Sequence, residues 1–244
     1  MALCQRCNKR EPLVTIGGRR LCEVCARDEI VKRIRREIHN TKLFNYSDEV
    51  AVLTKEPLDG ISKVLAYIIN RACYRCKLKV DVIELPADEN CKNINDYIWS
   101  YIIEGKKLQK YKVKVLPFFS DFFLSYMIYS ISTKDFSYLS IINLVKKIDD
   151  SYFFLPLFSV PLEELKGFVE IKELKFQDEL FNTIFNWVRS ELSENQELFH
   201  AYLSSLKLFG YKECKSCSAF IIDGEEYCAR CKKFLASPSP PYLI

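Results

Sequence analysis

Three consecutive segments decide the fold: EVAVLT at 49–54, KEPLDGISKVLAYIINRA at 55–72 and KVDVIEL at 79–85. The first and third are short apolar runs that predict strands, and apolar residues three and four apart over 59–72 predict a helix. Further helices are predicted over 93–107 and 121–132, with a third strand over 112–116. Strands that alternate with such helices are joined by right-handed crossovers. We therefore predict an α/β, Rossmann-like domain with a parallel sheet and helices on both faces.

Eight of the eleven cysteines form four CxxC pairs, two near each end of the chain. They are Cys4, Cys7, Cys22 and Cys25, and Cys214, Cys217, Cys228 and Cys231. Zinc prefers four tetrahedral thiolates, and a CxxC turn presents two of them to one ion. The sequence predicts two structural zinc ions, in a Cys4 finger over 1–26 and a Cys4 ribbon over 211–234. Iron–sulfur clusters or redox dithiols are the alternatives.

The other candidate metal-ligating or catalytic residues give weaker signals. Cys73 and Cys76 would need two more ligands to form a third metal or redox site, and Cys91 is the only other cysteine left. Thiols without a role are the simpler interpretation. The two histidines, His39 and His200, are predicted to pack or to cap helices. Two carboxylate pairs are assigned to solvated surface because no acid–base partner is identifiable; they are Glu163 with Glu164 and Asp149 with Asp150.

The positive charge of the chain is confined to its start. Residues 1–40 hold ten Lys/Arg and five Asp/Glu, a net +5, whereas the remaining 204 residues sum to −1. Residues 27–47 predict a basic helix and a linker, with an apolar stripe of Ile30, Ile34 and Ile38. The α/β domain is expected over 48–210, and residues 235–244 are expected to form a flexible tail. A helix over 178–208 should close the domain, with a core face of Leu180, Ile184, Trp187, Val188 and Leu192.

Neither a membrane span nor a secretory signal is indicated. The longest apolar stretch, at 115–131, is interrupted by Pro117, Ser120 and Asp121, while a span needs about 20 apolar residues. Met1 leads directly into Cys4, without the apolar run of a signal peptide. A cytoplasmic protein is therefore expected. The aromatic residues from Phe118 to Tyr129 could form core or an interface helix.

Local matches along most of the chain carry a family resemblance. They are GRRLCEVC at 18–25, REIHN at 36–40, EVAVL at 49–53, KVLAYII at 63–69 and PLFSVPLEEL at 156–165. With the paired Cys4 modules, they make the chain resemble the PP-loop thiolases that form 2-thiouridine in tRNA, the archaeal TtuA-type and eukaryotic cytosolic tRNA-thiolation group. The resemblance implies an ATP-pyrophosphatase-type domain between two zinc fingers, with tRNA as substrate.

Three departures from that family predict a degenerate relative. The glycine-rich ATP loop is replaced by TKEPLDG at 54–60, where Glu56 adds negative charge and Pro57 removes an N–H donor. The family's GHNxDD motif would fall on PFFSDF at 117–122, which keeps Asp121 alone. The family's three catalytic cysteines have no counterpart. No ATP binding is expected.

Our main hypothesis is a non-catalytic subunit in tRNA wobble-uridine 2-thiolation that binds tRNA, or pairs with an active PP-loop thiolase as a heterodimer, or forms a homodimer. The candidate phosphate-binding residues are Arg19, Arg20, Arg27, Lys32, Arg33, Arg35 and Arg36. A merely solvated helix face is the alternative for them. Two other functions remain open: a zinc-ribbon interaction protein unrelated to thiolation, and an active sulfurtransferase that uses Cys73 and Cys76.

Overall fold

The computed structural model describes residues 2–86, 91–168, 173–192, 204, 212–221 and 225–236. Within them, a five-stranded sheet has the order β4–β3–β5–β7–β6. Its strands are β3 (Glu49–Thr54), β4 (Lys79–Glu84), β5 (Val113–Val115), β6 (Val145–Ile148) and β7 (Ser151–Phe154). The first three and β7 are parallel, which confirms the predicted α/β sheet. Strand β7 and the antiparallel edge strand β6 are additions that the sequence did not reveal.

The apolar sequence of β3 suits its position between two neighbouring strands. Val50, Ala51, Val52 and Leu53 are all fully buried, as expected for a parallel strand covered on both faces. The edge strands β4 and β6 instead carry charged side chains, and most of their residues are exposed or half-buried. A two-residue turn at Asp149 and Asp150 joins β6 to β7, and both residues are exposed as predicted.

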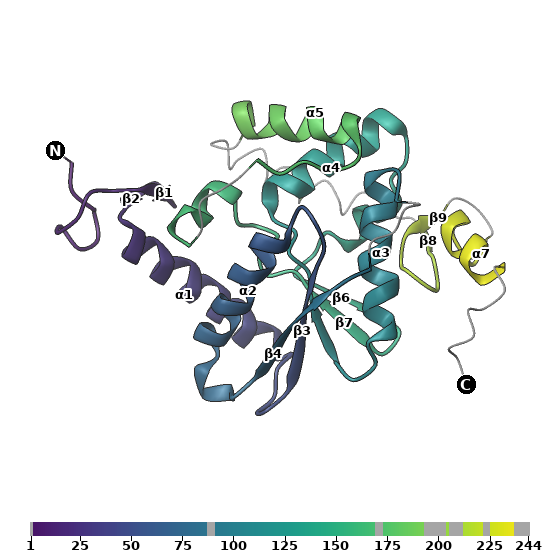
Figure 1. The fold of residues 1–244 in the computed structure, drawn as a ribbon, viewed down its shortest axis with the longest axis horizontal. Coiled ribbons are helices and arrows are strands. Elements are labelled where there is room, and N and C mark those ends of the chain that lie inside the picture. The colour runs from purple at the N-terminus through teal and green to yellow at the C-terminus, as the bar shows by residue number, and fades with distance from the viewer. Residues whose placement is uncertain are drawn as a thin grey trace.

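Helices cover the two faces of the sheet (Figure 1). Helices α1 (Glu23–Thr41) and α2 (Asp59–Ala72) pack together on one side, and α3 (Ile94–Lys107) lies on the other. Helices α4 (Ser120–Thr133) and α5 (Glu179–Trp187) pack together beyond the ends of the strands. None of the described helices is long and apolar enough to cross a bilayer.

Helix α1 uses the predicted apolar stripe. Ile30, Ile34 and Ile38 are buried, and they face α2 and the 3₁₀ segment η3 (Leu162–Gly167). The prediction for Glu164 was wrong: this η3 residue is only 2% exposed, because its carboxylate is paired with Arg33 of α1. Its neighbour Glu163 is exposed, as expected. His39 is exposed in the last turn of α1, so it is not packed in the core, and its predicted capping role stays a prediction.

Helix α5 buries a different face from the predicted one. Leu180 and Trp187 are 47% and 50% exposed, whereas Ile184 and Val188 are buried with two phenylalanines, Phe181 and Phe185. The phenylalanines lie against α4, so tertiary packing selects the stripe next to the predicted one. A π-helical turn continues α5 over Val188–Leu192. Apart from Ser204, the rest of the predicted helix to 208 lies outside the described residues, as do the Leu192 side chain, His200 and most of the predicted tail.

Candidate metal centres and the carboxyl edge of the sheet

The N-terminal cysteines converge on one point. Strands β1 (Val14–Ile16) and β2 (Arg19–Leu21) form a hairpin that carries Cys22 back to the first CxxC turn. The turn has only two residues, Gly17 and Gly18, both with positive φ, which glycine adopts without strain. The four Sγ atoms lie within 4.8 Å of one another, and those of Cys7 and Cys22 are 3.8 Å apart.

The C-terminal cysteines form an equally compact group. The short strands β8 (Lys212–Glu213) and β9 (Phe220–Ile221) and the start of helix α7 (Ala229–Ala236) bring the two CxxC pairs together. The four Sγ atoms lie within 4.8 Å of one another, with 3.7 Å between those of Cys217 and Cys228. Backbone N–H groups of Cys228 and Cys231 donate to sulfur atoms of the group, the arrangement expected around thiolates.

These sulfur spacings fit a single tetrahedral ion. Four bonds of 2.3 Å to a central zinc place the thiolates about 3.8 Å apart, which matches the Cys7–Cys22 and Cys217–Cys228 separations. A [4Fe–4S] cluster puts four separate irons between its thiolates and therefore spreads them further. The structure thus assembles both predicted Cys4 groups as candidate metal sites, and each can hold one small ion.

The C-terminal module is fixed to the sheet domain by contacts that the sequence did not suggest. Trp99 of α3 donates its indole N–H to Cys231 Sγ at 3.4 Å. Arg230 of α7 forms a 2.7 Å ion pair with Asp96 of α3. Lys106 donates to the Ser216 carbonyl at 2.7 Å. The metal module is therefore part of the α3 surface rather than a separate appendage.

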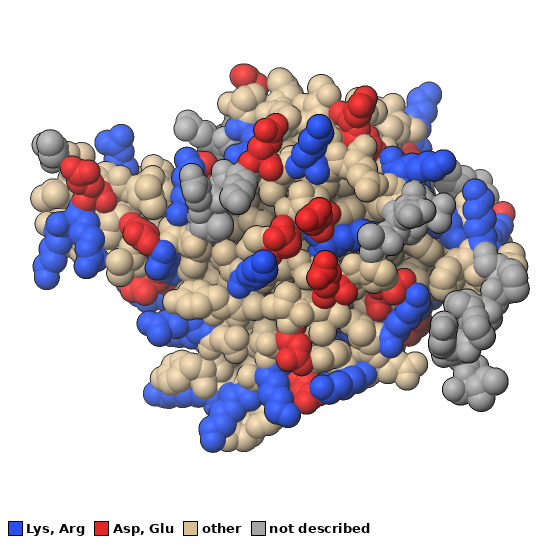
Figure 2. Space-filling model, in the orientation of Figure 1, with Lys and Arg blue, Asp and Glu red and all other residues tan. Residues whose placement is uncertain are grey.

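The seven predicted phosphate-binding residues fall into two groups. Arg27, Arg33 and Arg35 are engaged within the chain: Arg27 with Glu23 and the Gly167 carbonyl, Arg33 with Glu164, and Arg35 with the carbonyls of Ala72 and Arg71. The other four, Arg19, Arg20, Lys32 and Arg36, are exposed, although Arg19 also reaches Glu29 at 3.4 Å. Figure 2 shows Lys and Arg side chains along the left and lower edges of the molecule, with acidic side chains among them at the left and over the centre.

The carboxyl ends of β3 and β4 open onto a cavity of about 400 Å³. The loop that would cradle a phosphate there is a tight turn, because the Leu58 N–H donates to the Lys55 carbonyl. Pro57 follows a cis peptide bond and has no N–H. Glu56 and Glu84 add negative charge to the lining. In the turn between β3 and α2, two positions are therefore lost as phosphate donors: the Leu58 N–H is used internally and Pro57 has none.

Aromatic side chains occupy the place of the second family motif. Phe118, Phe119 and Phe122 are fully buried, and the first and third stack at 4.5 Å. These residues and the following aromatics of α4 belong to the core, not to an exposed interface. Asp121 is buried, accepts the Leu162 N–H at 2.7 Å, and has a pKa raised by burial. It caps η3 from within the core.

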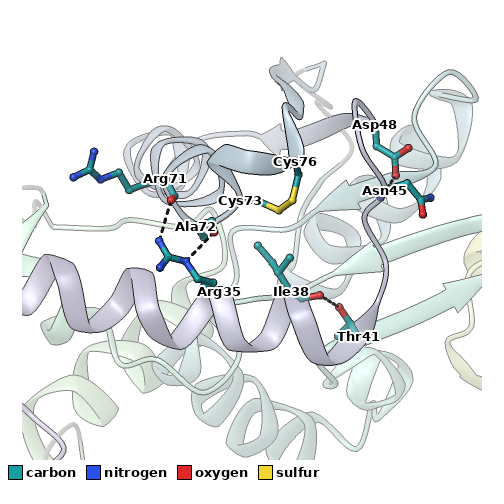
Figure 3. Close-up of a disulfide and its surroundings, with 9 residues drawn as sticks. All are labelled: Arg35, Ile38, Thr41, Asn45, Asp48, Arg71, Ala72, Cys73 and Cys76. Atoms are coloured by element: carbon teal, nitrogen blue, oxygen red, sulfur yellow. Dashed lines mark hydrogen bonds between the residues drawn. A yellow bond between two sulfur atoms is a disulfide. The ribbon is translucent and has the colours of Figure 1, made fainter.

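Two of the three remaining cysteines lie apart from this edge. Cys73 and Cys76 form a disulfide at the end of α2, so neither is a metal ligand here (Figure 3). The disulfide precedes β4, while the cavity lies at the far end of that strand, about 20 Å away along six residues. The buried Cys91 lines the cavity. The structure does not bring the three cysteines together.

No protein-family model and no curated protein matches the chain. Among solved structures, it is similar to the U34-tRNA thiolase NcsA from Methanococcus maripaludis with its [4Fe-4S] cluster, at a TM-score of 0.63 and 13% identity over 95% of both chains. At this identity the likeness concerns the fold. The chain therefore has the fold of a PP-loop thiolase, with a Cys4 group near each end.

Proposed function

We propose that this protein is a non-catalytic, tRNA-binding component of wobble-uridine 2-thiolation that pairs with a competent PP-loop thiolase in the cytoplasm. The fold shared with a U34-tRNA thiolase over 95% of both chains supports the link to tRNA. One observation carries the loss of catalysis: the turn after β3 contains Glu56 and Pro57 and uses its Leu58 N–H internally. An ATP phosphate would meet a carboxylate where it needs N–H donors.

The aromatic filling of 117–122 supports the same conclusion independently. Polar side chains that handle a nucleotide must face a cavity, whereas Phe118, Phe119 and Phe122 are packed on all sides. Asp121 has turned inward to hold Leu162. A small side-chain rotation could not restore nucleotide binding at 54–60 or at 117–122.

We assign zinc to both Cys4 groups. Sulfur separations of 3.7 and 3.8 Å support a single tetrahedral ion with thiolate ligands, and four protein ligands leave no open position for chemistry. In the N-terminal group, the ion would fix the β1–β2 hairpin and with it the exposed Arg19 and Arg20. Its contribution is to position this basic surface.

The tRNA-facing surface that we propose consists of Arg19, Arg20, Lys32 and Arg36. They are the exposed members of the predicted set that are not bonded to backbone carbonyls as the exposed Arg35 is, and none of them has a buried partner among the described residues. Each phosphate neutralised by such a residue contributes about 0.7–0.9 to the slope of log affinity against log salt. Four contacts predict a slope of about −3.

The deciding experiment combines tRNA binding with nucleotide binding on the full, metal-loaded chain. We expect binding of tRNA that weakens with salt, no measurable ATP binding by equilibrium dialysis, and co-purification with a PP-loop thiolase from native cells. Arg19→Gln with Arg20→Gln should reduce the salt slope by about 1.5. Lys63→Gln with Lys134→Gln, which removes two exposed charges elsewhere, is the matched control. ATP-dependent adenylation of tRNA by the chain alone would refute the proposal, and recovery only as a homodimer would refute the pairing.

A further inference from the structure

We propose that Cys73 and Cys76 form a thiol–disulfide exchange site whose substrate is a small anionic thiol. The site lies at the amino edge of the sheet, away from the Cys4 groups and from the carboxyl-edge cavity. It does not depend on the proposed role in tRNA thiolation.

The disulfide is accessible from a defined cavity. Cys73 ends α2 and Cys76 ends the 3₁₀ turn η1 (Tyr74–Cys76), and both residues are partly exposed. They line a cavity of about 630 Å³ between the ends of α1 and α2. This volume is in the range of sites for small molecules. Figure 3 shows the disulfide above the Ile38 side chain of α1, which forms an apolar floor.

The lining of this cavity is basic. It contains Arg35, His39, Lys42 and Arg75, and none of its lining residues is acidic. Arg35 donates to the Ala72 and Arg71 carbonyls, so it covers the negative end of helix α2 that would otherwise disfavour an anion (Figure 3). Asp48, in the neighbouring loop, accepts the Asn45 N–H. The charge next to the sulfurs is therefore positive.

Positive charge beside a CxxC pair has two effects on exchange. It stabilises the cysteine thiolate, which is the leaving group when the disulfide opens. It also raises the local concentration of an anionic attacking thiol, since clefts of one charge sign increase association rates by about 10- to 1,000-fold. A carboxylate- or phosphate-bearing thiol benefits from both effects, and a cationic thiol is repelled.

The reaction conserves atoms and electrons. A substrate thiolate attacks one cysteine sulfur, the Cys73–Cys76 bond breaks, and the other cysteine leaves as a thiolate. A second substrate thiolate then attacks the substrate sulfur of the mixed disulfide and releases the first cysteine. Two substrate thiols become one disulfide, and the protein disulfide becomes a dithiol with the two protons. The reverse reaction with a small disulfide reoxidises the protein.

Backbone hydrogen bonds prepare the site for reversal. The Cys73 N–H donates to the Ile69 carbonyl at 3.0 Å, and the Cys76 N–H donates to the Cys73 carbonyl at 2.9 Å. The Cys76 carbonyl accepts the Ser47 N–H at 2.8 Å. Because these bonds do not involve sulfur, the turn keeps the two thiols close after reduction.

The test measures reduction of the disulfide in the full, metal-loaded chain. The probes are reduced glutathione, which carries carboxylates, coenzyme A, which carries phosphates, neutral 2-mercaptoethanol and cationic cysteamine, with rates expressed per thiolate. Peptide mass mapping locates the mixed disulfide, and the Cys73→Ser/Cys76→Ser variant gives the background from the other cysteines. We expect the anionic probes to react at least about tenfold faster than cysteamine at low salt, with the advantage lost at high salt. The faster of glutathione and coenzyme A identifies the preferred anion.

Lys42→Gln with Arg75→Gln should reduce the anionic advantage to about threefold or less, because it removes two of the lining charges. Lys63→Gln, near the other end of α2, should leave it unchanged. Equal rates per thiolate for all four probes would overturn the proposal. It would also be overturned if Cys73 and Cys76 remained free thiols after treatment with oxidised glutathione.

Discussion

Arg33 and Glu164 provide the most demanding test of the structure, because the sequence assigned both side chains to solvent-facing roles. Their ion pair joins α1 to η3, with Arg33 Nη1 at 2.8 Å from Glu164 Oε2. The Glu164 side chain is 3% exposed and that of Arg33 is 25% exposed. The other carboxylate oxygen, Oε1, has no hydrogen-bond partner among the described residues. Arg33 is therefore the principal compensation for a buried charge.

Replacing Arg33 by glutamine should destabilise the fold by about 3 kcal/mol. Removal of one partner of a buried ion pair costs about 3–5 kcal/mol, because the remaining charge is left uncompensated. The lower end applies because Arg33 is partly exposed and glutamine retains an amide donor. Lys32→Gln, one residue earlier on the exposed face, should change the free energy of unfolding by less than about 0.5 kcal/mol.

The loss should depend on pH in a defined direction. Burial raises the pKa of Glu164, and the nearby Arg33 opposes that effect. A carboxyl with a higher pKa in the folded state makes stability fall as pH rises from its unfolded pKa through its folded pKa. Without Arg33 that window extends to higher pH. The deficit of Arg33→Gln should therefore be smallest in acid, where Glu164 is protonated in both proteins, and grow toward neutral pH.

Urea unfolding followed by circular dichroism at pH 5 and pH 7.5 measures both effects. Glu164→Gln in the Arg33→Gln background should recover part of the lost stability, because it removes the stranded charge. A double-mutant cycle gives the coupling between the two positions. If Arg33→Gln were as stable as Lys32→Gln at neutral pH, the ion pair would not support the fold and our account of Glu164 would fail.

Three further predictions concern packing and metal binding. Gly105→Ala should lower the free energy of unfolding by about 1–3 kcal/mol, because its Cβ would lie 2.8 Å from a Phe153 ring carbon; Gly60→Ala, which meets open space, should not. Cys217→Ser should reduce bound zinc from about two ions per chain to about one by mass spectrometry, while Cys73→Ser/Cys76→Ser keeps both. Trp99→Phe should speed release of the C-terminal ion to a chelator several-fold, since it removes the N–H that contacts Cys231 at 3.4 Å.

The strong local signals in the sequence were sufficient for most of the fold. The strand at 49–54 and the helix at 59–72 have the bounds that their apolar patterns predict. The hairpin at 145–154 was missed because Lys146, Lys147 and the two turn aspartates interrupt its apolar pattern. The buried face of α5 was wrong because adjacent helical stripes are both apolar, and only contact with α4 distinguishes Phe181 from Leu180.

The candidate sites were likewise predictable where the signal is local and not where it depends on long-range contacts. CxxC spacing identified both Cys4 groups, because the two ligands of each pair come from one turn. The contacts that fix the C-terminal module are long-range: Trp99 with Cys231 and Arg230 with Asp96 are separated by more than 130 residues. Charge alone could not separate Arg33, which is paired inside the chain, from Lys32, which is exposed. A buried partner on a distant segment leaves no local signal.

The aromatic stretch at 117–122 also determines how much stability the chain would lose if nucleotide-binding residues replaced it. Full burial of one phenylalanine contributes about 1.5–3 kcal/mol, and Phe118, Phe119 and Phe122 are all fully buried. Exchanging them for polar nucleotide-binding residues would remove a contribution comparable to the whole stability of many domains, about 5–15 kcal/mol. Restoring a glycine-rich loop at 54–60 alone would leave this packed core in place. We therefore expect such a loop graft to fold but not to gain ATP binding, and a graft that bound ATP without further change would contradict this argument.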